Sequence, residues 1–213
     1  MTMWRIRLYQ PRDRAAVRQI AGDSAHFGEP IERFFDARDL FLDAFAAYYT
    51  DVAGDYLWVA EGDGGEVLGY LMGCPDTAAY HRWFRSTVRG VAWRALTLRY
   101  RGLFTRKSLG YVWRYVRVRA PYIDLSAYPA HLHINTRAEA RGRGIGAALM
   151  TTYLDQLRAG DVKGVHLETT SANTIAAPWY QRLGFTLLQR TPTDLYRPST
   201  GRTIDLLVYG LKL

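Results

Sequence analysis

The stretch that decides the fold is AHLHINTRAEARGRGIGAAL, residues 130–149. Residues 130–136 are typical of a buried strand, and a helix is expected over about 147–158. Between them, glycines at 142, 144 and 146 allow a tight turn that a ligand can approach closely. The amide N–H groups of such a turn, and the positive end of the helix dipole, favour an anion. The stretch therefore predicts a strand, a turn that fits a diphosphate, and a helix.

The glycine turn alone does not identify its ligand. A strand-to-helix connection that merely needs small residues explains an isolated Gly-x-Gly equally well. The three glycines fall at every second position, which does not match the Gly-x-Gly-x-x-Gly dinucleotide fingerprint. No Gly-Lys-Ser/Thr follows, as it would in a nucleotide phosphate loop. NAD and ATP are therefore poorly supported as ligands.

Sequence patterns on both sides of this stretch alternate between strands and helices. Such an order predicts an α/β (α+β) protein, in which a mixed sheet carries helices on its faces. Apolar spacing and turn residues predict, in chain order, a strand at 5–9, helices after Pro11 and at 39–49, a hairpin of 56–61 with 66–73, a strand at 162–169, a helix at 175–183, and strands at 185–189 and 204–211.

The chain has 213 residues and a formal charge of +8, and this charge is concentrated in one segment. Residues 77–120, called the basic segment below, contain eleven of the 28 basic residues and none of the 20 acidic ones. The remainder of the chain has 17 basic against 20 acidic residues. The length favours a single domain spanning 1–213, in which the basic segment is a helical insertion.

Three interpretations of the basic segment are open. Its aromatic residues, among them Trp83, Trp93 and Trp113, pack on the sheet or on a second subunit while the arginines are solvated. Alternatively, the segment contacts an anionic membrane surface, since arginines alternate with Trp, Leu and Tyr. Contact with nucleic acid or the ribosome is the third interpretation. The first interpretation leaves a homodimer open, and the other two predict an anionic partner.

Composition excludes several classes of protein. With 48% hydrophobic and 14% aromatic residues the chain can bury a core, which excludes disorder, and no run of about 18 apolar residues could span a bilayer. Cys74 is the single cysteine, and the amino terminus, MTMWRIRLYQPRDR, lacks the apolar stretch of a signal peptide. A cytoplasmic protein is expected. No His, Cys, Asp and Glu residues have metal-ligand spacing, so no metal is expected.

Two motifs resemble those of the GNAT N-acetyltransferases. Arg141-x-x-Gly144-x-Gly146 matches the family's Gln/Arg-x-x-Gly-x-Gly/Ala acetyl-CoA signature. The segment Asn173-x-x-Ala176-x-x-Trp179-Tyr180-x-x-x-Gly184-Phe185 is similar to the family's second motif. The resemblance covers nearly the whole chain except residues 77 to about 127. It implies the GNAT fold, a mixed and mostly antiparallel sheet of six to seven strands, with acetyl-CoA as cosubstrate.

The resemblance also implies which residues hold acetyl-CoA. The strand edge at Ile134, Asn135 and Thr136 would pair with the pantetheine amides, and an amide there would polarise the thioester carbonyl. Asn173 would hydrogen-bond the pantetheine arm, and Tyr180 would lie beside the sulfur. The diphosphate would be held by the turn that contains Arg141, Gly142, Arg143, Gly144, Ile145, Gly146 and Ala147.

Catalytic roles follow from the same resemblance. Tyr180 would protonate the departing CoA thiolate, although a core tyrosine on a short helix is the alternative. The incoming ammonium must lose a proton before it attacks, so a base is required. Glu168 is the first candidate, because several amine-acetylating relatives carry a glutamate there, but a solvated strand glutamate fits equally. His133, if not simply a buried histidine, is the second candidate, and Asp124 and Glu29 are unranked.

A narrower resemblance concerns Tyr128-Pro-Ala-His-Leu-His-Ile-Asn135. This segment is similar to Tyr-Pro-Ser/Ala-His-Leu-His-Ile-Asp in bacterial relatives of the O-GlcNAcase acetyltransferase-like domain. Asn135 stands where those relatives often have Asp. If that Asp serves as a base, Glu168 or a bound water must replace it here. Some eukaryotic members of the group have lost cofactor binding, and the intact glycine turn argues against such a loss in this chain.

These observations predict an N-acetyltransferase that transfers the acetyl group of acetyl-CoA to a primary amine by direct attack. The alternative is a catalytically silent CoA-binding module that acts as a scaffold or binding protein. Within the family, the acceptor site implied for this chain is lined by 24–36, the basic segment and 191–203. A basic wall would suit an acidic acceptor.

Overall fold

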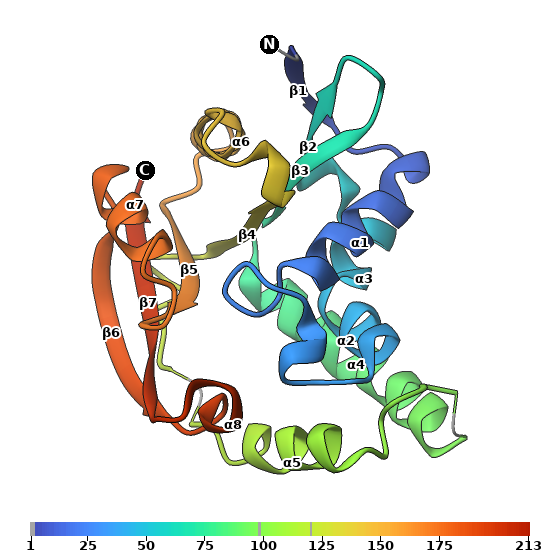
Figure 1. Ribbon diagram of the computed structural model, residues 1–213. Coiled ribbons are helices and arrows are strands. Elements are labelled where there is room, and N and C mark those ends of the chain that lie inside the picture. Colours follow the sequence, from blue (N-terminus) through green and yellow to red (C-terminus); the bar gives the residue numbers. More distant parts are fainter. Residues whose placement is uncertain (1–2, 98, 120) are drawn as a thin grey trace.

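In the residues that the computed structural model describes, 3–97, 99–119 and 121–213, the centre of the protein is a seven-stranded sheet (Figure 1). Neighbouring strands in the order β1-β2-β3-β4-β5-β7-β6 are antiparallel, except that β4 and β5 are parallel. The predicted mixed, mostly antiparallel sheet is therefore confirmed. The strands are β1 (Trp4–Leu8), β2 (Leu57–Gly62), β3 (Val67–Cys74), β4 (Ala130–Thr136), β5 (Gly164–Thr170), β6 (Thr186–Thr193) and β7 (Ile204–Lys212).

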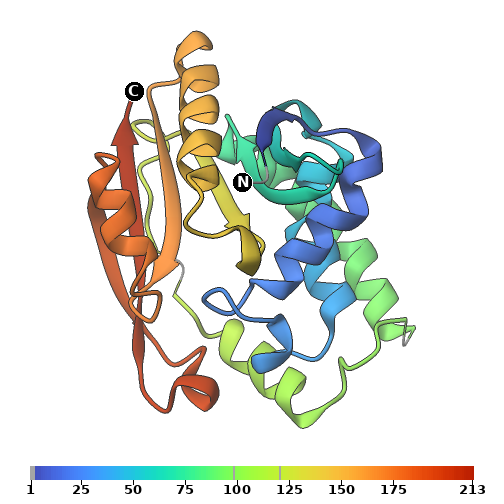
Figure 2. The same cartoon turned by 45° about the horizontal axis from the view of Figure 1, so that its top comes forward.

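Helices cover both faces of this sheet, as Figure 2 shows from a second direction. The helix expected over 39–49 is divided into α2 and α3, because the backbone at the buried Ala46 leaves regular helical geometry. The basic segment contains α4 and α5; its residues 98 and 120 lie outside the described part of the chain. The helices are α1 (Arg14–Asp23), α2 (Arg38–Phe45), α3 (Ala47–Asp51), α4 (Thr77–Leu96), α5 (Arg106–Tyr115), α6 (Ile145–Ala159), α7 (Ala176–Arg182) and α8 (Arg197–Thr200).

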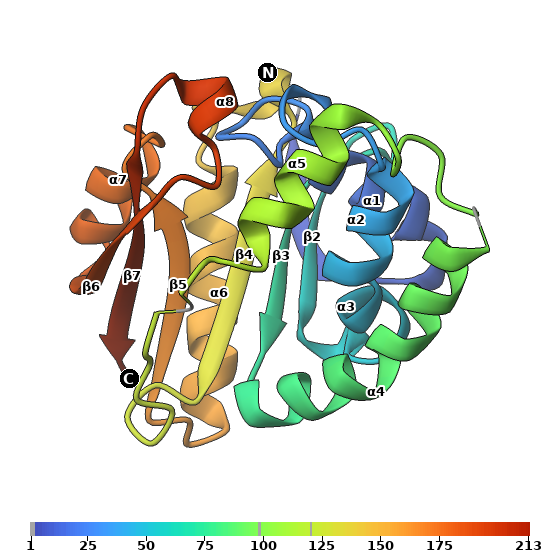
Figure 3. The same cartoon turned by 90° about the horizontal axis from the view of Figure 1, so that it is seen from below.

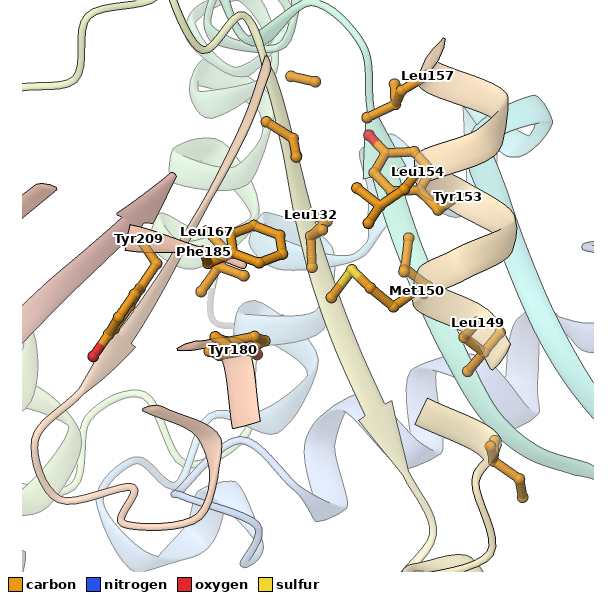
Figure 4. Packing of buried hydrophobic residues seen from close by; sticks show 14 of the residues in the cluster. Leu132, Leu149, Met150, Tyr153, Leu154, Leu157, Leu167, Tyr180, Phe185 and Tyr209 are labelled. Carbon is orange, nitrogen blue, oxygen red and sulfur yellow. The ribbon is translucent and has the colours of Figure 1, made fainter. Parts of the chain in front are cut away.

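Two apolar clusters fasten the helices to the sheet. On one face, α6 and α7 pack against the central strands, and Figure 4 shows Met150 and Tyr153 of α6 beside Leu132 of β4. On the other face, α1, α2 and α3 pack against β2 and β3 through buried residues such as Val17 and Tyr49. β2 and β3 are buried almost throughout, whereas β4 is only half-buried beyond Leu132, so a ligand can approach the sheet there.

β4 and β5 are joined over a short distance and then separate. Their parallel pairing consists of Ala130 with Val165 and His131 with His166. Leu132 and Leu167 belong to the cluster on the α6 face, so the residues next to them point to the opposite face. That opposite face therefore carries two rows of polar side chains that diverge from the last pair: His131, His133 and Asn135 on β4, and His166, Glu168 and Thr170 on β5.

α4 and α5 lie in the lower part of the view in Figure 1. Figure 3, seen from below, shows α5 crossing in front of β3 and β4. Trp83 of α4 packs against Tyr48, with ring centroids 5.1 Å apart, as the packed interpretation expects. Trp93 and Trp113, in contrast, are exposed. In the described part of the chain, no helix is long and apolar enough to cross a membrane.

Candidate active site

A cavity of about 660 Å³ opens where β4 and β5 separate, on the face that carries the two polar rows. Its wall is assembled from segments that are far apart in the sequence. It comprises the end of α1 and the loop after it, part of α2, the start of α4, the last residue of α5, residues 121–123, Leu125 and Tyr196. The cavity therefore lies between the motif-bearing strands and the basic segment.

The glycine turn has the geometry that an anion needs. Gly142 and Gly144 have φ angles of 74° and 79°, which favour glycine, and a Cβ at Gly142 would meet no atom within 4 Å. Gly144 precedes α6 and has no side chain to cap it, so the first N–H groups of this fifteen-residue helix have no partner within the helix. The open space at Gly142, the N–H groups at the start of α6 and the helix dipole together fit a diphosphate at Gly142 to Ala147.

The side chain of Arg141 points away from the glycine turn, toward the loop after α1. Its guanidinium Nη2 donates a hydrogen bond of 2.8 Å to the carbonyl oxygen of Gly28, in the loop after α1. Its side chain therefore fastens that loop to the glycine turn, and only its backbone belongs to the turn itself.

The edge of β4 that faces β5 is unpaired beyond His131 among the described residues. On its other edge, β4 pairs with β3 through Thr136, so Ile134, Asn135 and Thr136 are held in a straight strand. The Asn135 amide Nδ2 donates to the Tyr70 hydroxyl at 3.0 Å, which fixes its side chain. The edge thus offers backbone N–H and C=O groups to an extended ligand, as an added strand would use them.

Asn173 and Tyr180 line the cavity beside this edge. The Asn173 Oδ1 accepts a hydrogen bond of 3.1 Å from the backbone N–H of Ala176, the first residue of α7, and no described residue accepts a hydrogen bond from its Nδ2. Tyr180 is 7% exposed and packs against Phe185, 5.9 Å away, at the edge of the apolar cluster (Figure 4). Burial raises the pKa of Tyr180 above its ordinary value of 10, so the phenol stays protonated near neutral pH.

Glu168 faces the cavity directly. Its side chain is exposed to the space of the cavity, and the surrounding protein atoms desolvate its carboxyl, which raises the pKa of that group. Among the described residues that line the cavity, it is the one carboxylate. Asp124 and Glu29 do not line it: Asp124 accepts hydrogen bonds from Ser126, and Glu29 pairs with Arg33 at 2.9 Å.

The histidines on the polar rows differ in their surroundings. His131 is held on both ring nitrogens, 2.6 Å from the Tyr49 hydroxyl and 2.7 Å from the Thr77 hydroxyl, which suits a structural role. His133 also lines the cavity and packs against Phe45, 4.6 Å away. Burial lowers the pKa of His133 to about 4, so it is neutral and weakly basic.

Two results were not anticipated from the sequence. The basic wall is absent: within the described residues, the basic segment lines the cavity with Thr77, Tyr80, His81 and Tyr115, and with none of its arginines or its lysine. The expectation of a basic wall was wrong because these cations lie outside the cavity: all are exposed except Arg114, which is half-buried and donates to the Leu195 carbonyl. Thr170 also lines the cavity and was not predicted. The alternation of side chains along β5, from His166 through Glu168, is the sequence signal that indicates it.

Comparisons with known proteins agree with this geometry. The family model for the acetyltransferase (GNAT) family matches residues 15–185, which is more than half of the chain. The crystal structure of SsHAT is 28% identical, with 98% of each chain covered and a TM-score of 0.69. YncA of Salmonella typhimurium, a putative acetyltransferase solved with acetyl-CoA, is 16% identical, with 99% of this chain and 94% of that chain covered and a TM-score of 0.60.

The ribosomal-protein-alanine N-acetyltransferase of Brucella melitensis has the same fold, at 18% identity, a TM-score of 0.59, and coverage of 98% of this chain and 99% of that chain. The fold and the glycine turn before α6 agree with the family match. The chain belongs to the GNAT acetyltransferase family, whose cosubstrate is acetyl-CoA.

Proposed function

We propose that the protein is an N-acetyltransferase that transfers the acetyl group of acetyl-CoA directly to a primary amine. One observation carries the proposal: Glu168 and Tyr180 line the same cavity, at the point where the unpaired edge of β4 begins. A base for the incoming amine and an acid for the outgoing sulfur are therefore available in one cavity.

In this mechanism the amides from Gly142 to Ala147 hold the diphosphate, and the edge at Ile134 to Thr136 holds the pantetheine arm. An amide of that edge donates to the thioester oxygen and stabilises the negative charge that develops on it. Glu168, directly or through water, takes the proton that the ammonium loses. The amine nitrogen then forms a bond to the carbonyl carbon, the bond from this carbon to sulfur breaks, and the Tyr180 hydroxyl gives its proton to the sulfur. The second proton that the nitrogen loses as it becomes an amide passes through water to the Tyr180 phenolate, which restores the hydroxyl.

The pKa values favour Glu168 over His133 as the base. A general base is most effective when its pKa lies near the working pH. Burial moves the pKa of Glu168 upward, toward neutrality, whereas burial moves the pKa of His133 down to about 4.

Calorimetry with acetyl-CoA, followed by thiol release with a panel of primary amines, tests the proposal. We expect binding and thiol release, and we expect Glu168→Gln to lower kcat by about 10² to 10⁴-fold without weakening acetyl-CoA binding. Absence of acetyl-CoA binding would exclude the enzyme. Binding without release on any amine would instead support the silent CoA-binding module.

A second proposal concerns an anionic surface as partner of the basic segment. Leu109, Val112, Trp113 and Val116 are exposed at helical spacing on the outer side of α5, and Arg117 stacks on Trp113 with its guanidinium carbon 3.1 Å from the ring centroid. An apolar stripe beside arginines, in a segment without acidic residues, is complementary to an anionic lipid surface.

Co-sedimentation with vesicles that contain phosphatidylserine, at low and high salt, tests this second proposal. Binding should fall at high salt and in Trp113→Glu. Val52→Glu is the matched control, because Val52 is also exposed but follows α3, outside the basic segment. Absence of vesicle binding, together with dimerisation that Trp113→Glu abolishes, would overturn the lipid proposal and support a homodimer.

A further inference from the structure

The part of the cavity around Glu168 has an unusual balance of charge. Besides Glu168, its described lining contains no Asp, Lys or Arg, and its four histidines are His81, His131, His133 and His166. Burial lowers the pKa of the last three of these, so they are neutral near pH 7. The surroundings of the proposed base are therefore anionic, with no permanent cation to balance them.

Aromatic rings make up much of the remaining lining. Tyr80, Tyr115 and Tyr196 lie close enough to Glu168 for its charge to add to the effect of burial and raise the pKa of each phenol, for Tyr80 and Tyr196 to about 12. Phe27 completes this wall, edge-on to Tyr196 with ring centroids 5.2 Å apart. The faces of such rings attract cations and apolar groups.

These rings come from segments that are fastened to one another. Tyr115 is the last residue of α5, and the preceding residue, Arg114, donates from Nε to the Leu195 carbonyl at 3.0 Å. Tyr111, one turn earlier, packs against Phe34 at 4.8 Å. The aromatic wall is therefore held in place from both the α1 side and the β6–β7 side of the cavity.

Thr170 supplies a polar group that the protein itself does not use. Its side chain is 7% exposed, its Oγ1 has no hydrogen-bond partner among the described residues, and it lines the cavity two residues beyond Glu168 on the same side of β5. A buried hydroxyl without a partner is costly, and a bound ligand that carries a donor or acceptor would satisfy it.

From this arrangement we infer that the acceptor is a cationic primary amine on an aromatic or apolar body, without a carboxylate or phosphate near its nitrogen. This inference rests on the proposed function. The ammonium would lie between Glu168 and the aromatic rings, with Thr170 as a hydrogen-bond partner. An acidic group beside the nitrogen would be desolvated against Glu168 with no cation to pair with it.

A matched pair of ligands tests the inference: 2-phenylethylamine and L-phenylalanine, which differ by one carboxylate. Their binding to the full-length protein saturated with CoA, which cannot transfer an acetyl group, is measured by calorimetry, and thiol release is then measured with acetyl-CoA. We expect 2-phenylethylamine to bind at least 100-fold more tightly. Equal affinities, or tighter binding of phenylalanine, would overturn the inference. Selective binding of 2-phenylethylamine without thiol release would sustain the inference and count against the proposed function.

A charge placed inside or outside the cavity gives a second test. Tyr115→Arg puts a cation into the lining of the cavity that contains Glu168. Val116→Arg puts the same charge on the next residue, which is similarly exposed but does not line the cavity. Tyr115→Arg should reduce the preference for 2-phenylethylamine at least tenfold, and Val116→Arg should leave it unchanged. Equal behaviour of the two variants, with acetyl-CoA affinity retained in both, would contradict the inference.

Thr170→Val examines the unpartnered hydroxyl with almost no change in volume. We expect this variant to raise the KM for 2-phenylethylamine several-fold while acetyl-CoA affinity stays constant. An unchanged KM would remove Thr170 from the acceptor site.

Discussion

The acetyl-CoA half and the acceptor half of the cavity are built in different ways. Backbone groups form the first half, through the unpaired edge of β4 and the amides that begin α6. Side chains form the second half, and they come from α1, α2, α4, α5 and the segment between β6 and β7. A cosubstrate shared by a whole family can be held by a fixed backbone, whereas an acceptor specific to one member requires side chains that are free to vary.

The two halves also differ in what stabilises them. α6 is attached to the sheet by a large apolar cluster, as Figure 4 shows, and the glycine turn is an extension of that packing. α5 lies over the acceptor half and has mixed contacts: Tyr111 packs on Phe34, while Ser108 accepts a hydrogen bond of 3.0 Å from the Asp36 backbone N–H. The acceptor wall is therefore easier to loosen than the acetyl-CoA site.

Among the variants that compare the two halves, the largest effect is expected where the halves meet, at Tyr180. Tyr180→Phe removes the proposed acid and retains the ring, so kcat should fall about 10²-fold while acetyl-CoA affinity changes less than about twofold. Tyr209→Phe is the matched control, because Tyr209 is equally buried in the same cluster, 6.1 Å from Tyr180, but does not line the cavity. Steady-state kinetics of both variants gives the answer, and an unchanged kcat in Tyr180→Phe would refute the acid assignment.

The dependence of kcat/KM on pH separates Glu168 from His133 as the base. A base must be deprotonated, so kcat/KM should rise tenfold per pH unit below its pKa. Burial places this limb above the ordinary glutamate value of 4.5 if Glu168 is the base, and near pH 4 if His133 is. Burial also raises the pKa of Tyr180, so no falling limb of the acid is expected below pH 10.

The profile is measured with two amines of different basicity, because a limb that belongs to the enzyme does not move with the amine. A limb near pH 4 with both amines would transfer the role of base to His133.

The same contrast explains how far the sequence could be interpreted. The glycine turn, α6 and the Asn173 to Phe185 motif are contiguous, and each needs a particular residue for a local geometric reason, such as positive φ at Gly142 and Gly144. The acceptor wall has no such local signature. Nothing in the neighbourhood of Tyr115 or Tyr196 in the sequence indicates that they meet at Glu168, because that meeting depends on how α5 and the β6–β7 segment fold back over β5.

The charge of the basic segment misled the interpretation for a similar reason. Its arginines are numerous, but spacing along α4 and α5 does not say which side of each helix faces the cavity.

The narrower resemblance to bacterial relatives of the O-GlcNAcase acetyltransferase-like domain stays a prediction.

A smaller effect is expected in the acetyl-CoA half from Gly142→Ala. A Cβ there has space, so the direct cost is that of positive φ, about 1–2 kcal/mol of folding free energy. Gly65→Ala in the β2–β3 turn has the same cost, since Gly65 also has positive φ and an open Cβ position. Thermal unfolding should therefore change equally in both variants, whereas acetyl-CoA affinity should fall about tenfold in Gly142→Ala alone. Equal acetyl-CoA affinities would show that the turn does not hold the diphosphate.

The smallest effect is expected in the acceptor half from Asp36→Ala, which releases α5. The Asp36 carboxylate accepts hydrogen bonds of 2.6 Å from the Lys107 Nζ and the Thr105 hydroxyl, and these two groups lower its pKa. A lowered pKa means that this stabilisation is present above the unfolded-state pKa of Asp, about 3.9, and is lost as the pH falls through the folded-state value. At pH 7 the contribution is complete but modest, about 1 kcal/mol or less, because the group is partly exposed.

We therefore expect Asp36→Ala to raise the KM for the amine about threefold and to leave acetyl-CoA affinity unchanged, because it moves the aromatic wall and not the glycine turn. Asp155→Ala on α6 is the matched control: Asp155 also pairs with a cation, Arg158 at 2.9 Å, but in the half that apolar packing holds. It should change neither constant. If Asp36→Ala weakened acetyl-CoA and amine equally, the two halves would not be independent, and the cavity would have to respond to both ligands as one unit.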